Sequence, residues 1–138
     1  MKVIHLNHSD INGGAARAAY RIHHALRKRG IDSRMWVNSA NSGDWTVEGP
    51  ESKFERALAK IRPTIGHIPR RLLKTENLIM HSSSWLPSSW VKKINNSDAD
   101  VVHMHWVARE MLSIRDIGSI RKPVVWTFHD MWAFCGAE

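Results

Sequence analysis

The first 38 residues restrict the fold most, because a strand, a glycine turn, a helix and a second strand follow one another within them. Residues 3–7 are strand-like, Gly13 and Gly14 lie in a polar turn, and apolar positions recur at helical spacing from Ala15. A second strand is predicted over 34–37. Strands joined through a helix in this way are parallel, and their crossover is right-handed. The chain is therefore expected to be an α/β protein with a parallel sheet and flanking helices.

The helix that starts at Ala15 has a recognisable end. Arg27, Lys28 and Arg29 crowd its last turn, where cations favour the helix dipole, and Gly30 is a typical residue to stop it. The further elements are expected, in chain order, as a polar loop over 38–50, a helix from 54 that ends at Pro63, a second short helix over 69–74, a candidate strand over 77–80, a loop over 82–90, a strand over 100–105, a helix over 113–120 and a buried strand over 124–128.

Composition describes an ordinary globular domain. A chain of 138 residues, 43% hydrophobic and 24% charged, can form one domain with a genuine core. The single cysteine, Cys135, excludes an internal disulfide and fits a reducing compartment. Strand-like residues begin at Lys2, so no signal peptide is expected, and no run approaches the ~20 apolar residues that span a bilayer. These features favour a cytoplasmic protein.

Positive charge is concentrated in one segment of the chain. Residues 53–74 hold seven Lys or Arg side chains against Glu55 alone, which gives the segment a net charge of +6. Such a segment favours an acidic partner, which could be anionic lipid, a phosphorylated substrate or nucleic acid. A solvated helix face is the alternative. No RNP, zinc-finger or helix-turn-helix pattern accompanies the charge, so nucleic acid is not expected as a partner.

The glycine turn at the start of the first helix is a candidate anion site. Gly13 and Gly14 let the backbone approach a ligand closely, and the N–H groups at a helix N-terminus attract phosphate. Ala15, Ala16 and Arg17 follow, so the turn is no GxGxxG fingerprint and a standard dinucleotide site is disfavoured. The turn predicts contact with phosphate or sugar, and a tight turn without a ligand is the alternative.

His129 and Asp130 are the best catalytic candidates, because they follow a predicted strand directly. In open α/β sheets, ligands bind beyond the carboxyl ends of the strands. A histidine there can hydrogen-bond a substrate hydroxyl or a developing charge, and an adjacent carboxylate can orient groups or take a proton. The alternative is an Asp that caps a helix beside a structural histidine.

Other polar and aromatic residues lie near strand ends. His103 and His105 share one strand face, and with His129 they could offer three nitrogens to a metal. No HExxH or CxxC spacing supports this, so no metal is expected, and hydrogen-bonded groups near a cleft are the preferred interpretation. Trp106 and Trp132 could present flat faces to sugar rings, with core packing as the alternative.

Three strings together resemble the N-terminal half of family-four glycosyltransferases, the retaining GT-B enzymes that include many colanic acid and exopolysaccharide glycosyltransferases. They are DINGGAARAA over 10–19, DVVHMHW over 100–106 and WTFHDMWAFCGAE over 126–138. The third string is specific, and the order and spacing of all three strengthen the resemblance. Residues 40–98 match only as the variable acceptor-side region.

The resemblance implies two Rossmann-like domains that face a cleft, an N-terminal one for the acceptor and a C-terminal one for the nucleotide sugar. It implies a glycosyltransferase of the hexosyltransferase type that needs neither metal nor cofactor. It also assigns roles to residues of this chain. It places Gly13 and Gly14 at the donor diphosphate and His129, as a catalytic residue, by the donor sugar. From the residues themselves we add Asp130 as a second catalytic residue, Arg17 at the diphosphate, and His105, Trp106 and Trp132 at the acceptor.

By the same resemblance, residues 1–138 are an incomplete N-terminal acceptor-side domain, and the nucleotide-sugar domain is absent. The expected activity is transfer of a sugar from a nucleotide sugar to a glycan or lipid-linked acceptor in cell-surface polysaccharide biosynthesis. The fragment alone is expected to be inactive. A non-catalytic half-domain that binds an acceptor or a partner is the alternative. The basic segment 53–74 suggests attachment to the inner face of an anionic membrane.

Overall fold

A five-stranded, all-parallel sheet forms the centre of the protein, as the strand–helix–strand pattern predicted. The structure is a computed structural model, and it describes residues 1–68 and 82–135. The strand order is β3-β2-β1-β4-β5. The strands are β1 (Lys2–Ser9), β2 (Asp32–Ser39), β3 (Val47–Glu48), β4 (Val101–Met104) and β5 (Val124–Trp126).

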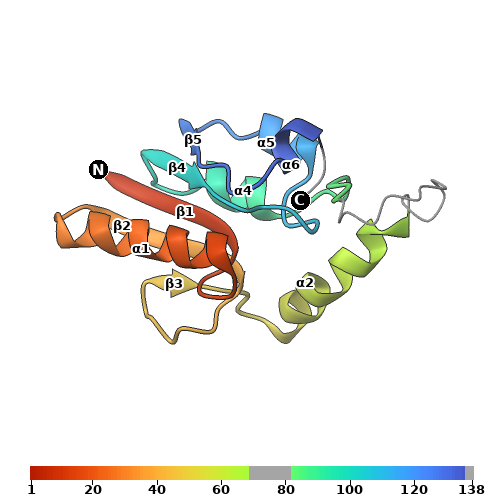
Figure 1. Cartoon of the computed structure of the whole chain (residues 1–138), viewed down its shortest axis with the longest axis horizontal. Coiled ribbons are helices and arrows are strands. Elements are labelled where there is room, and N and C mark those ends of the chain that lie inside the picture. The colour runs from red at the N-terminus through yellow and green to blue at the C-terminus, as the bar shows by residue number, and fades with distance from the viewer. Residues whose placement is uncertain (69–81, 136–138) are drawn as a thin grey trace.

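Helices lie on both faces of this sheet, while one helix projects away from it (Figure 1). On one face, α1 packs along β1 and β2; the opposite face is covered by the C-terminal helices and the segment over 107–112. In Figure 1, α2 extends to the side of the sheet. The helices are α1 (Gly14–Lys28), α2 (Lys53–Gly66), α4 (Trp90–Asn95), α5 (Ile114–Gly118) and α6 (Trp132–Cys135).

The two faces of the sheet are buried in different ways. One face is apolar: Ile4, Leu6 and Met104 pack there against Ile94 and Leu112. Since side chains alternate along a strand, the intervening residues of β1 and β4 point to the α1 face. On that face α1 covers a small apolar cluster, which consists of Ala19, Met35 and Val37. Beside this cluster lie polar residues, including the completely buried His5, His23 and Ser33.

The strand order reverses at β1, which places a ligand crevice there. β1 pairs with β2 on one side and with β4 on the other, so the chain winds outward in both directions from this strand. In open parallel sheets such a switch point leaves a crevice beyond the carboxyl ends of the two central strands. The ends of β1 and β4 at Ser9 and Met104 therefore mark where a ligand site is expected.

The first helix agrees closely with its prediction. Gly13 precedes α1 with φ of 96°, and Gly30 follows it with φ of 77°, a region where only glycine is unstrained. Arg27 and Lys28 lie in the last turn of the helix. The glycines at both ends thus serve backbone geometry, as the sequence indicated.

Several predicted elements are wrong. Pro63 does not end its helix, because α2 continues to Gly66; its missing N–H leaves the carbonyl of Ala59 on a helix that is largely exposed, where water can bind it. The loop over 38–50 contains β3, which is too short to show a pattern. The helix α4 was not predicted. The elements expected over 69–74 and 77–80 lie outside the described residues.

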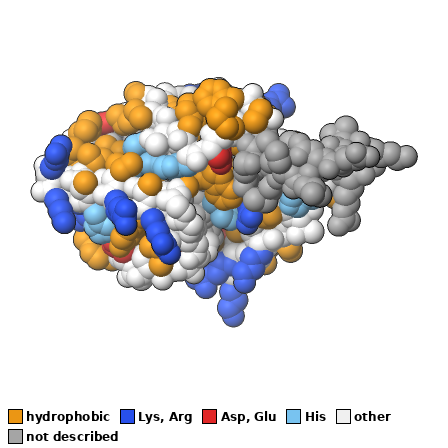
Figure 2. All heavy atoms as spheres, viewed as in Figure 1, with side chains coloured by type: hydrophobic (Ala, Val, Ile, Leu, Met, Phe, Trp, Pro, Cys, Tyr) orange, Lys and Arg blue, Asp and Glu red, His pale blue; other side chains and the backbone are white. Residues whose placement is uncertain are grey.

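The last strand is also less buried than predicted. β5 pairs with β4 alone, so it forms an edge of the sheet as described, and Val124 and Val125 are 42% and 51% exposed. Figure 2 shows hydrophobic side chains gathered over the upper part of the molecule, where β5 and α6 lie in Figure 1. The apolar sequence of β5 predicted a buried strand, because such a sequence is typical of parallel strands that are covered on both faces.

The C-terminal end of α2 is held against the rest of the protein. The Arg62 guanidinium donates to the backbone carbonyls of Leu86, Pro87 and Glu110, at 2.7, 2.8 and 2.8 Å. A Cβ at Gly66 would lie 2.3 Å from Cγ of Glu110, so the helix and that side chain are in close contact. No helix in the described part of the chain is long and apolar enough to cross a membrane.

Candidate functional site

A cavity of about 430 Å³ opens beyond the carboxyl ends of the central strands. It is lined from five places in the sequence: the end of β1, the start of α1, the last residue of β2, the loop after β4 and the loop after β5. The structure thus brings Gly13, Gly14, Trp106, His129 and Asp130 to one cavity. The complete lining consists of Asn7, His8, Ser9, Asn12, Gly13, Gly14, Ala15, Ala16, Ser39, Trp106, Arg109, His129 and Asp130.

The start of α1 offers unoccupied space and backbone donors. No side chain caps the helix at Gly13, and its first turn holds no acidic residue, so no carboxylate of that turn occupies its first N–H groups or offsets the positive end of its dipole. A Cβ added at Gly14 would meet no atom within 4 Å. Arg17 is exposed and does not line the cavity, although its backbone N–H donates to Gly13 O at 3.2 Å.

A buried carboxylate fixes the loop beside this turn. Asp10 is fully buried and accepts hydrogen bonds from the backbone N–H groups of Ile11, Asn41 and Ser42, at 2.9, 2.8 and 2.7 Å. Burial alone would raise the pKa of Asp10, but the hydrogen bonds from Ser42 and Asn41 outweigh it and lower the pKa. The carboxylate therefore stays charged and holds the loop after β2 against the end of β1.

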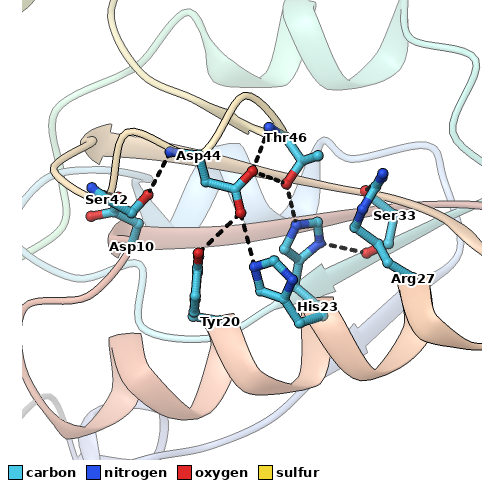
Figure 3. A network of polar contacts seen from close by, with 9 residues as sticks. Asp10, Tyr20, His23, Arg27, Ser33, Ser42, Asp44 and Thr46 are labelled. Atoms are coloured by element: carbon cyan, nitrogen blue, oxygen red, sulfur yellow. Dashed lines mark hydrogen bonds and ion pairs between the residues drawn. The ribbon is translucent and has the colours of Figure 1, made fainter.

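The same loop is tied to α1 by a second polar network, drawn in Figure 3. Asp44 accepts hydrogen bonds from the Tyr20 hydroxyl at 3.0 Å and from the Thr46 N–H at 2.8 Å, and Nε2 of His24 lies 2.8 Å from it. Behind it, His23 contacts the Thr46 hydroxyl at 2.8 Å. Burial would raise the pKa of Asp44, but the hydrogen bonds from Thr46 and Tyr20 lower it to about 2. These contacts make the wall of the site rigid.

His129 reaches the cavity from the loop after β5. Its Nε2 lies 3.1 Å from Nδ1 of the buried His105, so the opposite nitrogen, Nδ1, is left for a ligand. Burial lowers the pKa of His129, and the charge of Asp130 opposes this shift. The imidazole is therefore neutral near pH 7 and can donate or accept one hydrogen bond in the cavity.

Asp130 does two things at once in this geometry. It lines the cavity, and its Oδ1 also accepts the backbone N–H of Trp132 at 2.9 Å, at the start of α6. The capping alternative considered for Asp130 therefore describes a contact that is present. A single carboxylate with two oxygens can cap the short helix and still face a ligand.

The three predicted acceptor residues lie at different depths. Trp106 is partly exposed in the cavity wall, with its ring 5.4 Å from that of His8 and the Arg109 guanidinium 5.6 Å from its centre. His105 and Trp132 are only 2% and 7% exposed and do not line the cavity. The Trp132 ring joins the core and donates its Nε1–H to the carbonyl of residue 82.

Sequence reasoning missed several residues of the cavity wall. Asn7 lies at the end of β1 and accepts the Trp106 N–H at 2.8 Å, which joins the loops after β1 and β4. Burial, together with the charge of Arg109, lowers the pKa of His8 to about 4, so His8 is neutral at pH 7. The polar residues that end β1 could have been identified by the rule that ligands bind beyond strand ends. Arg109 carried no such signal, because it reaches the site through a turn with φ of 54°.

A groove of about 800 Å³ continues the cavity toward α2. The two share His8, Ser39 and Arg109, and the groove is also lined by Arg56 and Lys60. It is therefore more basic than the cavity, and it leads from the predicted catalytic residues to the segment with the highest positive charge.

Among the residues that the structure describes, two groups of side chains have the spacing of a metal site. One is His5, His103 and His105, and the other is His23, His24 and Asp44; in each, the possible ligand atoms lie within 4.8 Å of one another. The first group differs from the predicted set, because His5 replaces His129. In the structure, Nδ1 of His5 lies 3.0 Å from Nε2 of His105, and His103 contacts the Thr127 hydroxyl at 2.7 Å.

Comparison with protein families gives one match, to the model of Glycosyltransferase Family 4, over residues 12–137. The match spans nearly the whole chain, including the glycine turn and the His129-Asp130 pair. The chain belongs to glycosyltransferase family 4. Comparison with curated proteins and with solved structures gives no match.

Membership in family 4 makes the chain a glycosyltransferase family 4 domain, so a nucleotide-sugar donor and an acceptor are its ligand classes. The all-parallel sheet with helices on both faces is the fold expected of the N-terminal Rossmann-like domain of a GT-B enzyme. The cavity at the switch point is where such a fold binds ligands.

Proposed function

We propose that the domain transfers a sugar from a nucleotide sugar at the cavity beyond β1 and β4. One observation carries this proposal: Gly13 and Gly14 line the same cavity as His129 and Asp130, although more than a hundred residues separate the two pairs. A helix N-terminus can bind the diphosphate, and a neutral histidine beside it can hydrogen-bond the charge that develops on transfer, so this arrangement suits transfer from a nucleotide sugar.

In this proposal the donor diphosphate lies against the first N–H groups of α1. Gly14 allows this approach because the space beside its Cα is empty. Arg17 is proposed to contact the donor from the exposed side of the first turn. His129 hydrogen-bonds the donor sugar as charge develops, and Asp130 orients a hydroxyl or takes its proton.

The acceptor is proposed to enter through the basic groove and to reach the cavity at Trp106. The ring of Trp106 offers an apolar face for a sugar, while Arg56, Lys60 and Arg109 line the path. His105 and Trp132 are predicted acceptor residues whose burial favours a supporting role behind the wall. A glycan or lipid-linked acceptor of cell-surface polysaccharide synthesis, as in colanic acid and exopolysaccharide pathways, suits such a groove.

We further propose that residues 1–138 form the acceptor-side half of a two-domain GT-B enzyme. The cavity lies beyond the carboxyl ends of β1 and β4, and a second Rossmann-like domain would supply the nucleotide contacts there. The chain alone is then expected to bind donor weakly and to transfer no sugar. Transfer by purified residues 1–138 would contradict this domain assignment and would support a complete active site within the chain.

Gly14→Val is expected to abolish the binding of a nucleoside diphosphate without unfolding the domain. A side chain at this position meets no protein atom, so it projects into the space that the diphosphate would occupy. We would follow backbone amide shifts by NMR during titration with UDP. Gly118→Val is the matched control, because Gly118 also has empty space beside it but lies in α5, away from the cavity. Unchanged UDP binding in Gly14→Val would remove the diphosphate from this turn.

The exposed side of α2 supports a proposed attachment to anionic membrane. Phe54, Leu58 and Ile61 recur at helical spacing and are 75%, 40% and 52% exposed, with Lys53 and Lys60 beside them. An apolar stripe flanked by cations is typical of helices that lie in the membrane interface. Of the other basic residues in the segment, Arg62 already donates to three backbone carbonyls of the domain. Arg70, Arg71 and Lys74 lie outside the described residues.

Vesicles of phosphatidylglycerol are expected to bind the domain at low salt, and neutral vesicles are not. Each Lys or Arg near an anionic surface contributes roughly 1 kcal/mol, so Lys53→Gln with Lys60→Gln should weaken binding by about tenfold or more. Flotation measures this, and Lys28→Gln with Arg29→Gln is the control at the end of α1. Equal loss in both double variants would mean that α2 is only a solvated face.

A further inference from the structure

A line of three histidines runs from the interior of the protein to the cavity. Nδ1 of His5 on β1 lies 3.0 Å from Nε2 of His105, and Nδ1 of His105 lies 3.1 Å from Nε2 of His129. The ring planes of the two pairs differ by 20° and 24°, and the ring centres are 5.3 and 5.4 Å apart, which is the N···N distance plus one centre-to-nitrogen distance on each side, so each contact runs from ring edge to ring edge. These are the distances and orientations of two N–H···N hydrogen bonds in series.

Each histidine of this line carries a single ring proton. Burial, assisted by neighbouring histidines, lowers the pKa of His5 to about 3 and that of His105 to about 2. Burial also lowers the pKa of His129. All three are therefore neutral at pH 7, and each has one N–H donor and one bare nitrogen acceptor.

With one proton per ring, the two hydrogen bonds must point the same way. If His105 donates to His5, then His129 must donate to His105, and Nδ1 of His129 is left bare. If His5 donates to His105, then His105 donates to His129, and Nδ1 of His129 carries the proton. The tautomer at the cavity is therefore determined by the proton position on His5, two residues away along the line.

The buried end selects between these two arrangements. Nε2 of His5 is fully buried and has no hydrogen-bond partner in the described part of the chain. Buried N–H groups without an acceptor are among the rarest features of folded proteins. The arrangement in which this atom is bare avoids such a group, and it places the proton of His5 on Nδ1, toward His105.

We propose that His5 and His105 are positioning residues that hold His129 in the Nδ1–H tautomer, so that this N–H donates to the ligand in the cavity. The inference rests on the proposed function for the use of that N–H, because a donor suits a sugar oxygen or a phosphate oxygen. The line itself rests only on hydrogen-bond geometry. It accounts for the buried His5 of β1 and the buried His105 directly after β4, on the α1 face of the sheet, where polar residues lie beside a small apolar cluster.

The tautomer can be read directly in the chain of 138 residues. Long-range ¹H–¹⁵N correlation of the imidazole rings near neutral pH distinguishes protonated from bare nitrogens. We expect wild-type His129 to show a protonated Nδ1 and a bare Nε2. His105→Phe keeps a ring in the core but removes both nitrogens, so the His129 signals should shift to the averaged position of a ring that exchanges between tautomers.

His103→Phe is the matched control. His103 lies on the same strand, with its ring 4.2 Å from that of His105, but it contacts Thr127 instead of His129. It should leave the His129 signals in place. If His105→Phe does not fold, the wild-type spectrum still decides, because a protonated Nε2 or averaged signals in wild-type His129 would overturn the proposal.

Two further outcomes separate this inference from the proposed function. A stoichiometric metal ion in the purified protein, held by His5, His103 and His105, would overturn the hydrogen-bond line. A fixed Nδ1–H tautomer without any UDP binding would support the line and would count against the diphosphate site. UDP binding by a protein in which His129 exchanges between tautomers would support the diphosphate site and would count against the line of histidines.

Discussion

Lowering the pH from about 7 to about 5 is expected to destabilise the domain strongly. His5, His23 and His105 are buried almost completely, and burial lowers their pKa values to about 3, 4 and 2. In the unfolded chain a histidine titrates near pH 6.5. Below that pH the unfolded state therefore binds protons that the folded state excludes, and the free energy of unfolding falls as the pH decreases.

The size of the effect rivals the whole stability of a domain. At about pH 5 each of these three histidines lowers the free energy of unfolding by roughly 2 kcal/mol, and the typical free energy of unfolding of a domain is about 5–15 kcal/mol. The buried carboxylates act later: the pKa of Asp44 is lowered to about 2, so its contribution is lost only below about pH 4, where the unfolded carboxyl begins to bind protons. The acid transition is therefore set by histidines.

Tryptophan fluorescence and far-UV circular dichroism against pH measure this transition, since the chain has seven tryptophans. His23→Gln keeps hydrogen-bonding groups near Ser33 and Thr46 but does not titrate, so its stability should fall less steeply with pH. His67→Gln, at the end of α2, is the control and should leave the slope unchanged. If the free energy of unfolding stays constant between about pH 7 and 5, then His5, His23 and His105 are hydrated or protonated in the folded state.

In the two-domain transferase that we propose, His129→Ala is expected to lower kcat on the order of 10²-fold, with a modest change in KM. Removing a hydrogen bond that strengthens in the transition state typically costs about 3 kcal/mol. The same change leaves Nδ1 of His105 without its partner, which costs about 1–3 kcal/mol of stability and lowers Tm. Both values are measured on one preparation, by initial rates and by thermal melting.

His67→Ala is again a suitable control, because His67 does not line the cavity and should change neither kcat nor KM. Asp130→Asn tests the neighbouring carboxylate, since the amide oxygen can still accept the Trp132 N–H while the charge is removed. If His129→Ala lowers Tm but the folded fraction turns over at the wild-type rate, His129 is structural and the catalytic assignment is wrong.

The N-terminal part of the fold was predictable because its signals are local. Apolar spacing after Ala15 and the glycines at either end describe α1 without any distant contact. β3 and α4 were missed because two residues, or six, are too few for a period to emerge. The proline at 63 was given too much weight, since a largely exposed helix can leave a carbonyl to water.

The site was predictable where it follows strand ends, and not where it depends on packing. Gly14 and His129 were found by the rule that ligands bind beyond the carboxyl ends of parallel strands. The sequence did not indicate a role for His5, because the pattern of a strand is the same whether its histidine faces solvent or another histidine. Its role depends on the register that pairs it with His103, and this register forms only when residues about a hundred positions apart meet.

The attachment of α2 gives the domain an arm with a C-terminal base and an exposed N-terminal tip, and residues 49–52 join this tip to β3. Arg62 and Gly66 hold the base against Glu110, whereas Lys53 and Phe54 at the tip are exposed. The carboxylate of Glu110 in turn accepts the backbone N–H groups of residues 85 and 86, so the base is clamped from two sides. A load on this arm therefore reaches the body at two places, which are β3, through residues 49–52, and the turn that carries Arg109, through Glu110, so that contact with the arm is passed to this part of the cavity wall as well as to the edge of the sheet.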